Sequence, residues 1–272
     1  MIPTLPRTSI QSLFVQAFTS SGRLVIWLPM LMYFALKVSV MFFYLATVRG
    51  PLQPLWAFGL DATAAARLDH YPWDLLLMPV IMANVELWLE VVVGVILQGA
   101  TFLLFMAAME ESRLSLGDAM QNATRRWLHL FGVALVASLV LFLWFWLWEE
   151  YLRGLRIPFR MRSLTQYGVA AAVQALFVYA IPLVLADGLN APKALWTSVR
   201  LAVSSPLRSL VIVLVPLALT WPATFLSGET RVLVDRLSPE ILVHVQIAQE
   251  IIHVPAMVIL FGALAALFHK RS

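Results

Sequence analysis

Three charged residues lie within or beside stretches that are otherwise apolar, where a charge is expensive. Lys37 lies inside the apolar run 24–47, and Glu86 and Glu90 are four residues apart in NVELWLE. A lysine at mid-membrane costs roughly 2.5–3.5 kcal/mol on insertion scales, so such residues are functional candidates. At 1.5 Å per residue Lys37 lies about 15 Å from the end of its run, and Glu90 nearly reaches that depth in an antiparallel neighbour. We therefore predict an intramembrane ion pair of Lys37 with Glu90 and Glu86.

Two other interpretations of these three residues stay open. The Lys37 side chain can extend toward the lipid headgroups while the glutamates lie in the interface. Alternatively, the three residues belong to a path for a substrate or for protons.

Other chemistry has little support in the chain. There is no Cys, no spacing of His and carboxylates typical of a metal site, no phosphate-binding loop and no nucleophile elbow. We therefore predict no metal, no cofactor and no catalytic residue. The segment 149–162 places four arginines among apolar residues, which favours contact with phospholipid headgroups or a partner protein over nucleic acid. They are Arg153, Arg156, Arg160 and Arg162.

The composition predicts a membrane protein. Of the 272 residues, 61% are hydrophobic and 12% are charged, against roughly 45–50% and about 25% in soluble proteins, and the mean hydropathy is +0.84. A globule of this length cannot bury so much apolar surface, so lipid must cover much of it. We predict an all-α integral membrane protein with a single domain over 1–272 and no separate soluble domain.

Six stretches are long and apolar enough to cross a hydrocarbon core of ~30 Å, which takes about 20 residues of helix. We expect spans at about 24–47, 83–109, 127–148, 167–186, 207–226 and 249–268. The connector 48–82 is also apolar, but prolines such as Pro79 interrupt it. We expect an interfacial segment there, with a re-entrant hairpin as the alternative.

The distribution of charge favours one orientation. With six spans, both termini and the loops 110–126 and 187–206 share one side, which has an excess of Lys and Arg over acidic residues. The positive-inside rule then predicts a multi-pass protein of the bacterial inner membrane with both termini in the cytoplasm. The arginines of 149–162 oppose this orientation, because it places them outside.

A polar residue that can cap a helix precedes an amphipathic stretch before spans one, three and five. These residues are Thr8, Ser115 and Asn190, whose side-chain oxygens can accept hydrogen bonds from the first helical turn. We predict three hairpins of membrane helices, each preceded by an amphipathic helix in the cytoplasmic interface. The competing interpretation is that any helix entering a membrane acquires an amphipathic start.

The segment 181–219 carries a resemblance. Its first part, 181–201 (IPLVLADGLNAPKALWTSVRL), resembles a signature of six-span bacterial and archaeal membrane proteins, P-L-V-L-x-[ED]-G-x-x-x-x-x-A-L-x-x-S-x-x-L. That group is similar to the membrane domain fused ahead of glycerophosphodiester phosphodiesterase domains. Matching positions include Asp187, where the group usually has Glu, and Gly188, Ala194, Leu195 and Ser198. The resemblance implies a six-span fold but no reaction, since no loop is long enough to hold the phosphodiesterase domain.

These observations predict a non-enzymatic inner-membrane protein, namely an accessory, scaffold or lipid-interacting component of a membrane complex. Its expected partners are membrane lipids and other membrane-protein subunits, without nucleic acid. The alternative is a small transporter or permease for a lipid or an apolar solute, because internal repeats and proline-broken helices are typical of transporters. A transporter requires a polar cavity around Lys37.

Overall fold

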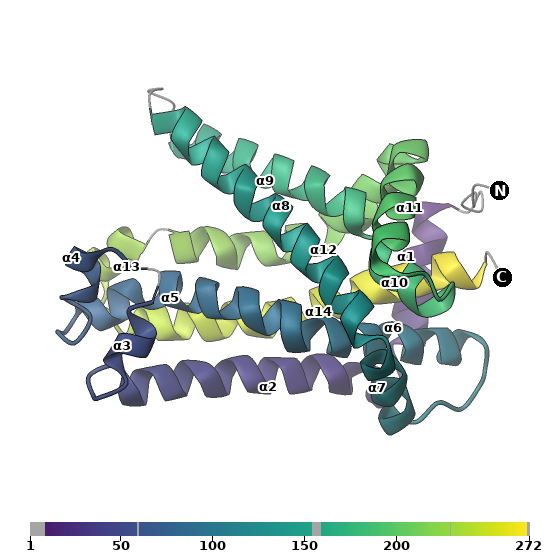
Figure 1. Cartoon of the computed structure of the whole chain (residues 1–272), viewed down its shortest axis with the longest axis horizontal. Coiled ribbons are helices and arrows are strands. Elements are labelled where there is room, and N and C mark those ends of the chain that lie inside the picture. The colour runs from purple at the N-terminus through teal and green to yellow at the C-terminus, as the bar shows by residue number, and fades with distance from the viewer. Residues whose placement is uncertain (1–8, 59, 154–158, 229, 271–272) are drawn as a thin grey trace.

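The computed structural model describes residues 9–58, 60–153, 159–228 and 230–270, which form helices without a strand. Six helical stretches are long and apolar enough to cross a membrane, so the chain is a multi-pass membrane protein. They are Leu24–Thr47, Trp73–Met109, Trp127–Trp148, Tyr167–Ala186, Pro206–Leu226 and Ile241–His269. The described chain begins and ends at the same end of the bundle, as an even number of crossings requires (Figure 1).

Some spans are single helices and others are interrupted. In chain order they are α2 (Leu24–Thr47), α5 (Trp73–Leu89) continued by the π-helical turn η1 (Glu90–Gly94) and α6 (Val95–Met109), α8 (Trp127–Arg153), α9 (Phe159–Phe177) continued by α10 (Ala180–Ala186), α12 (Pro206–Gly228) and α14 (Ile241–His269). Short helices lie at the two ends of the bundle (Figure 1). At one end are α1 (Ile10–Ser20), α7 (Leu116–Arg125) and α11 (Ala191–Ser204), and at the other are α3 (Gln53–Trp56), α4 (Ala62–Ala65) and α13 (Thr230–Arg236).

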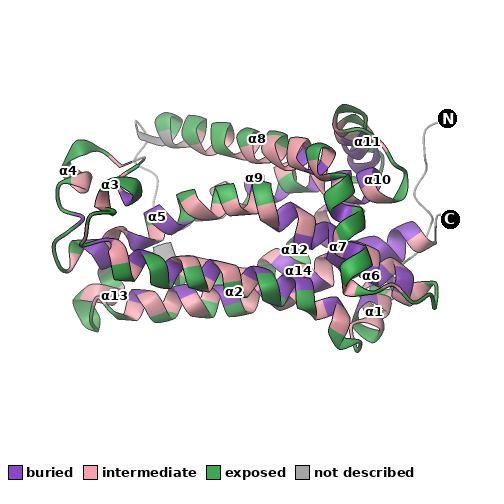
Figure 2. Ribbon diagram, turned by 60° about the horizontal axis from the view of Figure 1, so that its bottom comes forward, coloured by how far each residue is buried: buried purple, intermediate pink, exposed green. Residues whose placement is uncertain are grey.

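The helix α14 lies at the centre of the packing and contacts α1, α2, α6 and α12. Its C-terminal half is buried from Phe261 to Phe268. By contrast, α8 and α9 diverge from α2 and α5 toward the end that carries α4, and most of α8 is exposed or half-buried (Figures 1 and 2). The membrane region therefore has a tightly packed side around α14 and a loosely packed side along α8.

The two largest of the apolar cores among the described residues follow one another along the bundle. The larger contains Tyr33 and Phe261, and the smaller contains Met41 and Trp56. On α2, Lys37 lies one turn from Tyr33 and one turn from Met41, so it falls between the two cores. The middle of the membrane region is thus where the apolar packing is interrupted.

The second span begins ten residues earlier than the sequence predicted, at Trp73. Pro79, which we expected to interrupt this segment, lies inside α5. A proline removes one backbone hydrogen bond from a helix, and neighbouring helices make this loss tolerable in a membrane bundle. Within the connector 48–82, the part ahead of Trp73 holds the short helices α3 and α4.

The sixth span also begins earlier than expected, at Ile241 in place of a residue near 249. Its additional turns contain His244 and Gln246, which lower the hydropathy of this segment. The structure nevertheless buries Gln246, because its side chain reaches a hydrogen-bond partner on α5.

Helices are present at the three positions ahead of spans one, three and five. Ser115 and Asn190 each accept a hydrogen bond from the backbone N–H three residues later, as N-cap residues do. The first of these helices is capped by Ser9, while Thr8, the residue we expected in this role, lies outside the described residues. The interfacial location of these helices and their grouping with hairpins stay predictions.

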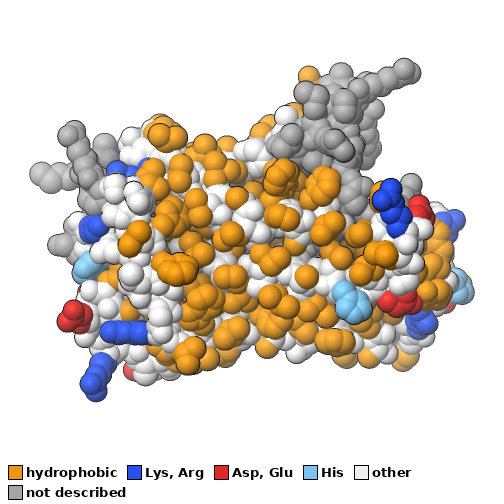
Figure 3. Space-filling model, turned by 180° about the vertical axis from the view of Figure 1, so that it is seen from behind, with side chains coloured by type: hydrophobic (Ala, Val, Ile, Leu, Met, Phe, Trp, Pro, Cys, Tyr) orange, Lys and Arg blue, Asp and Glu red, His pale blue; other side chains and the backbone are white. Residues whose placement is uncertain are grey.

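Surface side chains are sorted by kind along the bundle. Figure 3 shows a broad apolar band over the middle, with Lys, Arg, Asp and Glu near the two ends. This is the distribution expected when hydrocarbon surrounds the middle and water covers the ends.

Candidate functional site

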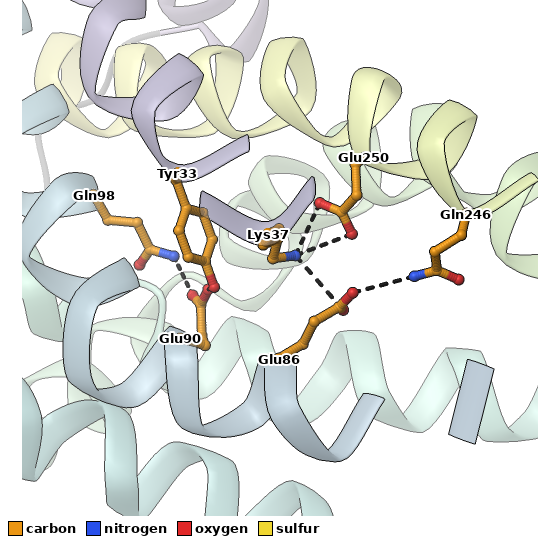
Figure 4. A network of polar contacts seen from close by, with 7 residues as sticks. All are labelled: Tyr33, Lys37, Glu86, Glu90, Gln98, Gln246 and Glu250. Carbon is orange, nitrogen blue, oxygen red and sulfur yellow. Dashed lines mark hydrogen bonds and ion pairs between the residues drawn. The ribbon is translucent and has the colours of Figure 1, made fainter. Parts of the chain in front are cut away.

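Polar side chains from several membrane helices meet between the two apolar cores (Figure 4). On three of the helices two such residues are four positions apart, so they lie on one face, one turn from each other. They are Tyr33 and Lys37 on α2, Glu86 and Glu90 on α5 and η1, and Gln246 and Glu250 on α14, with Gln98 added by α6. We call these seven residues the polar cluster.

Lys37 joins α2 to two other helices through its ammonium group. Its Nζ lies 3.0 Å from Glu250 Oε2 and 3.6 Å from Glu86 Oε2. Gln246 Nε2 donates to Glu86 Oε1 at 3.1 Å, which fixes that carboxylate from the other side. Lys37 and Glu250 are 8% and 5% exposed, so this is a buried ion pair and the lysine does not extend to the headgroups.

Glu90 is held by neutral donors. The Tyr33 hydroxyl donates a hydrogen bond to Glu90 Oε2 at 2.6 Å, and Gln98 Nε2 donates a hydrogen bond to Glu90 Oε1. Within the described part of the chain no Lys, Arg or His nitrogen lies within 4.0 Å of the Glu90 carboxylate. The cluster therefore combines one paired cation with one carboxylate that lacks a cationic partner.

Gly94 makes the contact between Tyr33 and Glu90 sterically feasible. A Cβ at Gly94 would lie 2.8 Å from Glu90 Oε2 and 3.0 Å from the Tyr33 hydroxyl. Gly94 also ends the π-helical turn that begins at Glu90. Such turns are rare in proteins overall, and those that occur often lie at functional sites. The geometry of Glu90 thus depends on a backbone feature that sequence periodicity does not show.

The sequence predicted both Glu86 and Glu90 as partners of Lys37, and the structure brings only Glu86 to the lysine. In the antiparallel packing of α2 against the second span, Lys37 lies beside Glu86 and Tyr33 lies beside Glu90 (Figure 4). Our depth estimate differed from this register by one helical turn, about 5.4 Å.

Sequence reasoning missed Glu250, although it lies inside the sixth span that we expected. The available signal was an acidic residue inside an apolar run, opposite in charge to the only lysine within a span. Gln246, four residues earlier, repeats the spacing of Glu86 and Glu90. A search for complementary charges between spans would have found this pair.

A groove of about 520 Å³ runs beside the polar cluster. Lys37, Glu86 and Glu90 line one side, and the α8 residues Ala137 and Ser138 line another, while most of the remaining lining is apolar. Small-molecule sites are typically clefts of about 300–1,000 Å³ with mostly apolar walls and a few polar groups. The groove has the dimensions and the lining of such a site.

His253 of α14 also lines the groove. Its Nε2 is buried and lacks a hydrogen-bond partner among the residues that the structure describes. Since buried polar atoms in native proteins nearly always have a partner, this nitrogen is available to a ligand atom or to water. Across the same described ranges, no three His, Cys, Asp or Glu side chains are placed to hold a metal ion.

The residues of the 181–201 motif lie away from the polar cluster and shape a turn. Gly188 has a φ of +66°, a left-handed conformation that favours glycine, and its carbonyl accepts from Arg126 Nη1 at 3.4 Å. Ala194 is fully buried, Leu195 packs against the larger core, and Asp187 lies at the end of α10. These placements suit a role in positioning α10 against α11.

Ser198 of the same motif supports the interruption between α9 and α10. Pro182 lacks a backbone N–H and so cannot pair with the carbonyl four residues earlier. Near this break, Ser198 Oγ accepts from Tyr179 N at 3.2 Å and donates to the Leu176 carbonyl at 2.7 Å. One side chain therefore serves a donor and an acceptor beside the break.

Ser198→Ala is expected to lower the free energy of unfolding by about 1 kcal/mol, because both of these backbone groups lose their side-chain partner. Reversible unfolding in detergent, followed by circular dichroism, measures the change. Ser204→Ala on the same helix is the control, since Ser204 Oγ bonds only the Leu201 carbonyl in its own helix. Equal stability of the two variants would refute this role.

The side chains of the four arginines that we expected to contact headgroups or a partner lie outside the described residues. Arg156 is not among the described residues, and neither are the side chains of Arg153, Arg160 and Arg162. Their contact with lipid or protein stays a prediction.

Fold and site together define a multi-pass helical membrane protein with a buried charged cluster beside a mid-membrane groove. Comparison of the chain with models of protein families, with curated proteins and with solved structures finds no match. The relation to the membrane domain of glycerophosphodiester phosphodiesterases accordingly stays a prediction.

Proposed function

We propose that this protein is a small transporter or permease that holds a lipid-like or apolar solute in the groove beside Lys37. The observation that carries the proposal is the polar cluster, which places charged groups against an otherwise apolar groove at the middle of the membrane region. Charged residues inside membrane spans are costly and typically mark pathways for ions, protons or substrates.

The interrupted helices support the same proposal. In the second span the π-helical turn η1 begins at Glu90, and the fourth span is interrupted between α9 and α10. Transporters commonly form their binding sites from discontinuous helices near the bilayer midplane. Both interrupted spans contribute residues to the groove, including Glu90 and Ile181.

Native mass spectrometry of the purified protein in mild detergent tests the proposal. We expect a small molecule to co-purify with the wild type and to be lost from Ala137→Trp, because the indole would fill the groove. Val136→Trp is the matched control: Val136 is the preceding residue on α8, is 39% exposed and does not line the groove. If both variants retain the small molecule equally, or if the wild type carries no bound molecule, the result contradicts a role in transport.

A scaffold or accessory role in a membrane complex is the second candidate, and the observation that favours it is the exposure of α8. In the span Trp127–Trp148, only 11% of the most apolar stretch is buried inside the protein, against 67% in the span Trp73–Met109. Another subunit could cover that face. A stable protein companion in the same purification, lost on Val136→Trp, would favour the scaffold.

The remaining expectations on location belong to the proposal. We infer a bacterial inner membrane with both termini in the cytoplasm, because of the excess of Lys and Arg on that side. Reporter fusions to the C-terminus, active only on one side of the membrane, test this orientation.

A further inference from the structure

We propose that the groove binds an organic cation with apolar groups, and that the Glu90 carboxylate holds its positive charge. This inference rests on the proposed function, because it names the class of solute that the groove would take.

Carboxylates outnumber cations around the groove. The charged residues of the polar cluster are one lysine and three glutamates. Among the described residues of the groove lining, α8, α9 and α12 add only neutral polar residues such as Ser138 and Gln174, and α14 adds the imidazole of His253. Lys37 balances one carboxylate. In a region of low dielectric an excess of carboxylates attracts a cation and repels an anion.

The carboxylate without a cationic partner is that of Glu90. The Lys37 ammonium lies against Glu250 and Glu86, whereas Glu90 is bonded by the neutral donors Tyr33 and Gln98. Glu90 is only partly buried and lines the groove. A cation in the groove can therefore approach Glu90 without displacing Lys37.

Most of the remaining groove lining is apolar or aromatic. Phe177 and Phe261 line it together with aliphatic side chains of α10, α12 and α14. Aromatic ring faces attract cations, and apolar walls favour a ligand whose charge is attached to hydrocarbon groups. A small hydrated ion would leave these walls without a counterpart.

An anion is disfavoured by the same geometry. Lys37, the only lysine among the described residues of the groove lining, already contacts two carboxylates, so an anion would have to displace Glu250 or Glu86 from it. It would also lie beside the Glu90 carboxylate. The groove thus discriminates by the sign of the charge.

Two ions of nearly the same size and shape but opposite charge provide the test. Radiolabelled tetraphenylphosphonium and tetraphenylborate are titrated separately against the full chain in lipid nanodiscs, with empty nanodiscs as the blank. We expect saturable binding of tetraphenylphosphonium and no saturable binding of tetraphenylborate. Equal binding of both ions, or no saturable binding of the cation, would overturn the inference.

Variants assign the effect to Glu90. Glu90→Gln keeps the size of the side chain and is expected to weaken tetraphenylphosphonium binding at least tenfold, whereas Glu111→Gln, at an exposed loop position, leaves it unchanged. Glu90→Asp retains the charge and should bind more tightly than Glu90→Gln. If Glu90→Gln binds tetraphenylphosphonium as tightly as the wild type, the role of Glu90 is contradicted. If that variant does not fold, Glu90→Asp must still bind tetraphenylphosphonium and not tetraphenylborate.

The outcomes separate this inference from the proposed function. If both ions bind and Ala137→Trp abolishes both, the groove holds solutes as a transporter requires, but the preference for cations is wrong. If neither ion binds and no molecule co-purifies with the wild type, the proposed function fails as well.

Discussion

Replacing Lys37 with methionine is expected to lower the free energy of unfolding by about 3–5 kcal/mol, the usual effect of removing one partner of a buried ion pair. The methionine has a similar length, so the change removes the charge and leaves little empty space. Glu250 and Glu86 would then face each other without the cation that lies 3.0 and 3.6 Å from them. The loss comes from two carboxylates left uncompensated inside the protein.

Unfolding by denaturant in detergent micelles, followed by circular dichroism, measures this loss. The triple variant Lys37→Met, Glu86→Gln and Glu250→Gln should recover more than half of it, since its neutral side chains no longer repel and the Gln246 contact can persist. Lys193→Met removes an exposed lysine and should change stability by less than about 0.5 kcal/mol. A Lys37→Met protein as stable as Lys193→Met would show that the ion pair contributes nothing.

The membrane architecture could be predicted from sequence because it depends on local composition. A run such as 24–47 is apolar over its whole length, and α2 occupies the same residues. The predictions were wrong where tertiary contacts override local signals. Pro79 lies within a helix because the bundle tolerates the lost hydrogen bond, and Gln246 is buried because Glu86 lies within reach.

The site was predictable only in part, because it depends on the register between helices. The cost of a charge in lipid identified Lys37, but the hairpin geometry placed Glu90 at its depth, whereas the structure pairs Lys37 with Glu86, one turn away. Which turn of one helix faces which turn of another is set by packing across the bundle, so Glu250 and Tyr33 could not be assigned from periodicity. The structure brings seven polar side chains together there, as Figure 4 shows, where the sequence indicated only Lys37, Glu86 and Glu90.

Gly262→Ala and Gly168→Ala are expected to change stability in opposite directions, although both add one methyl group to a glycine of a membrane helix. At Gly262 the new Cβ would lie 2.8 Å from Ala17 Cβ and 2.9 Å from Phe105 Cζ. These atoms belong to α1 and α6, the neighbours of α14, and an alanine Cβ cannot move without its backbone. Overpacking of this kind costs about 1–3 kcal/mol.

At Gly168 the described residues leave open space around the added Cβ, so the expected effect is the better helix propensity of alanine, a gain of up to ~1 kcal/mol. The same denaturant titration compares both variants with the wild type. Because the helix propensity gain applies at both positions, the difference between the variants isolates the close approach of α14 to α1 and α6. If Gly262→Ala were as stable as Gly168→Ala, the tight packing of these three helices would not be the feature that requires glycine at this position.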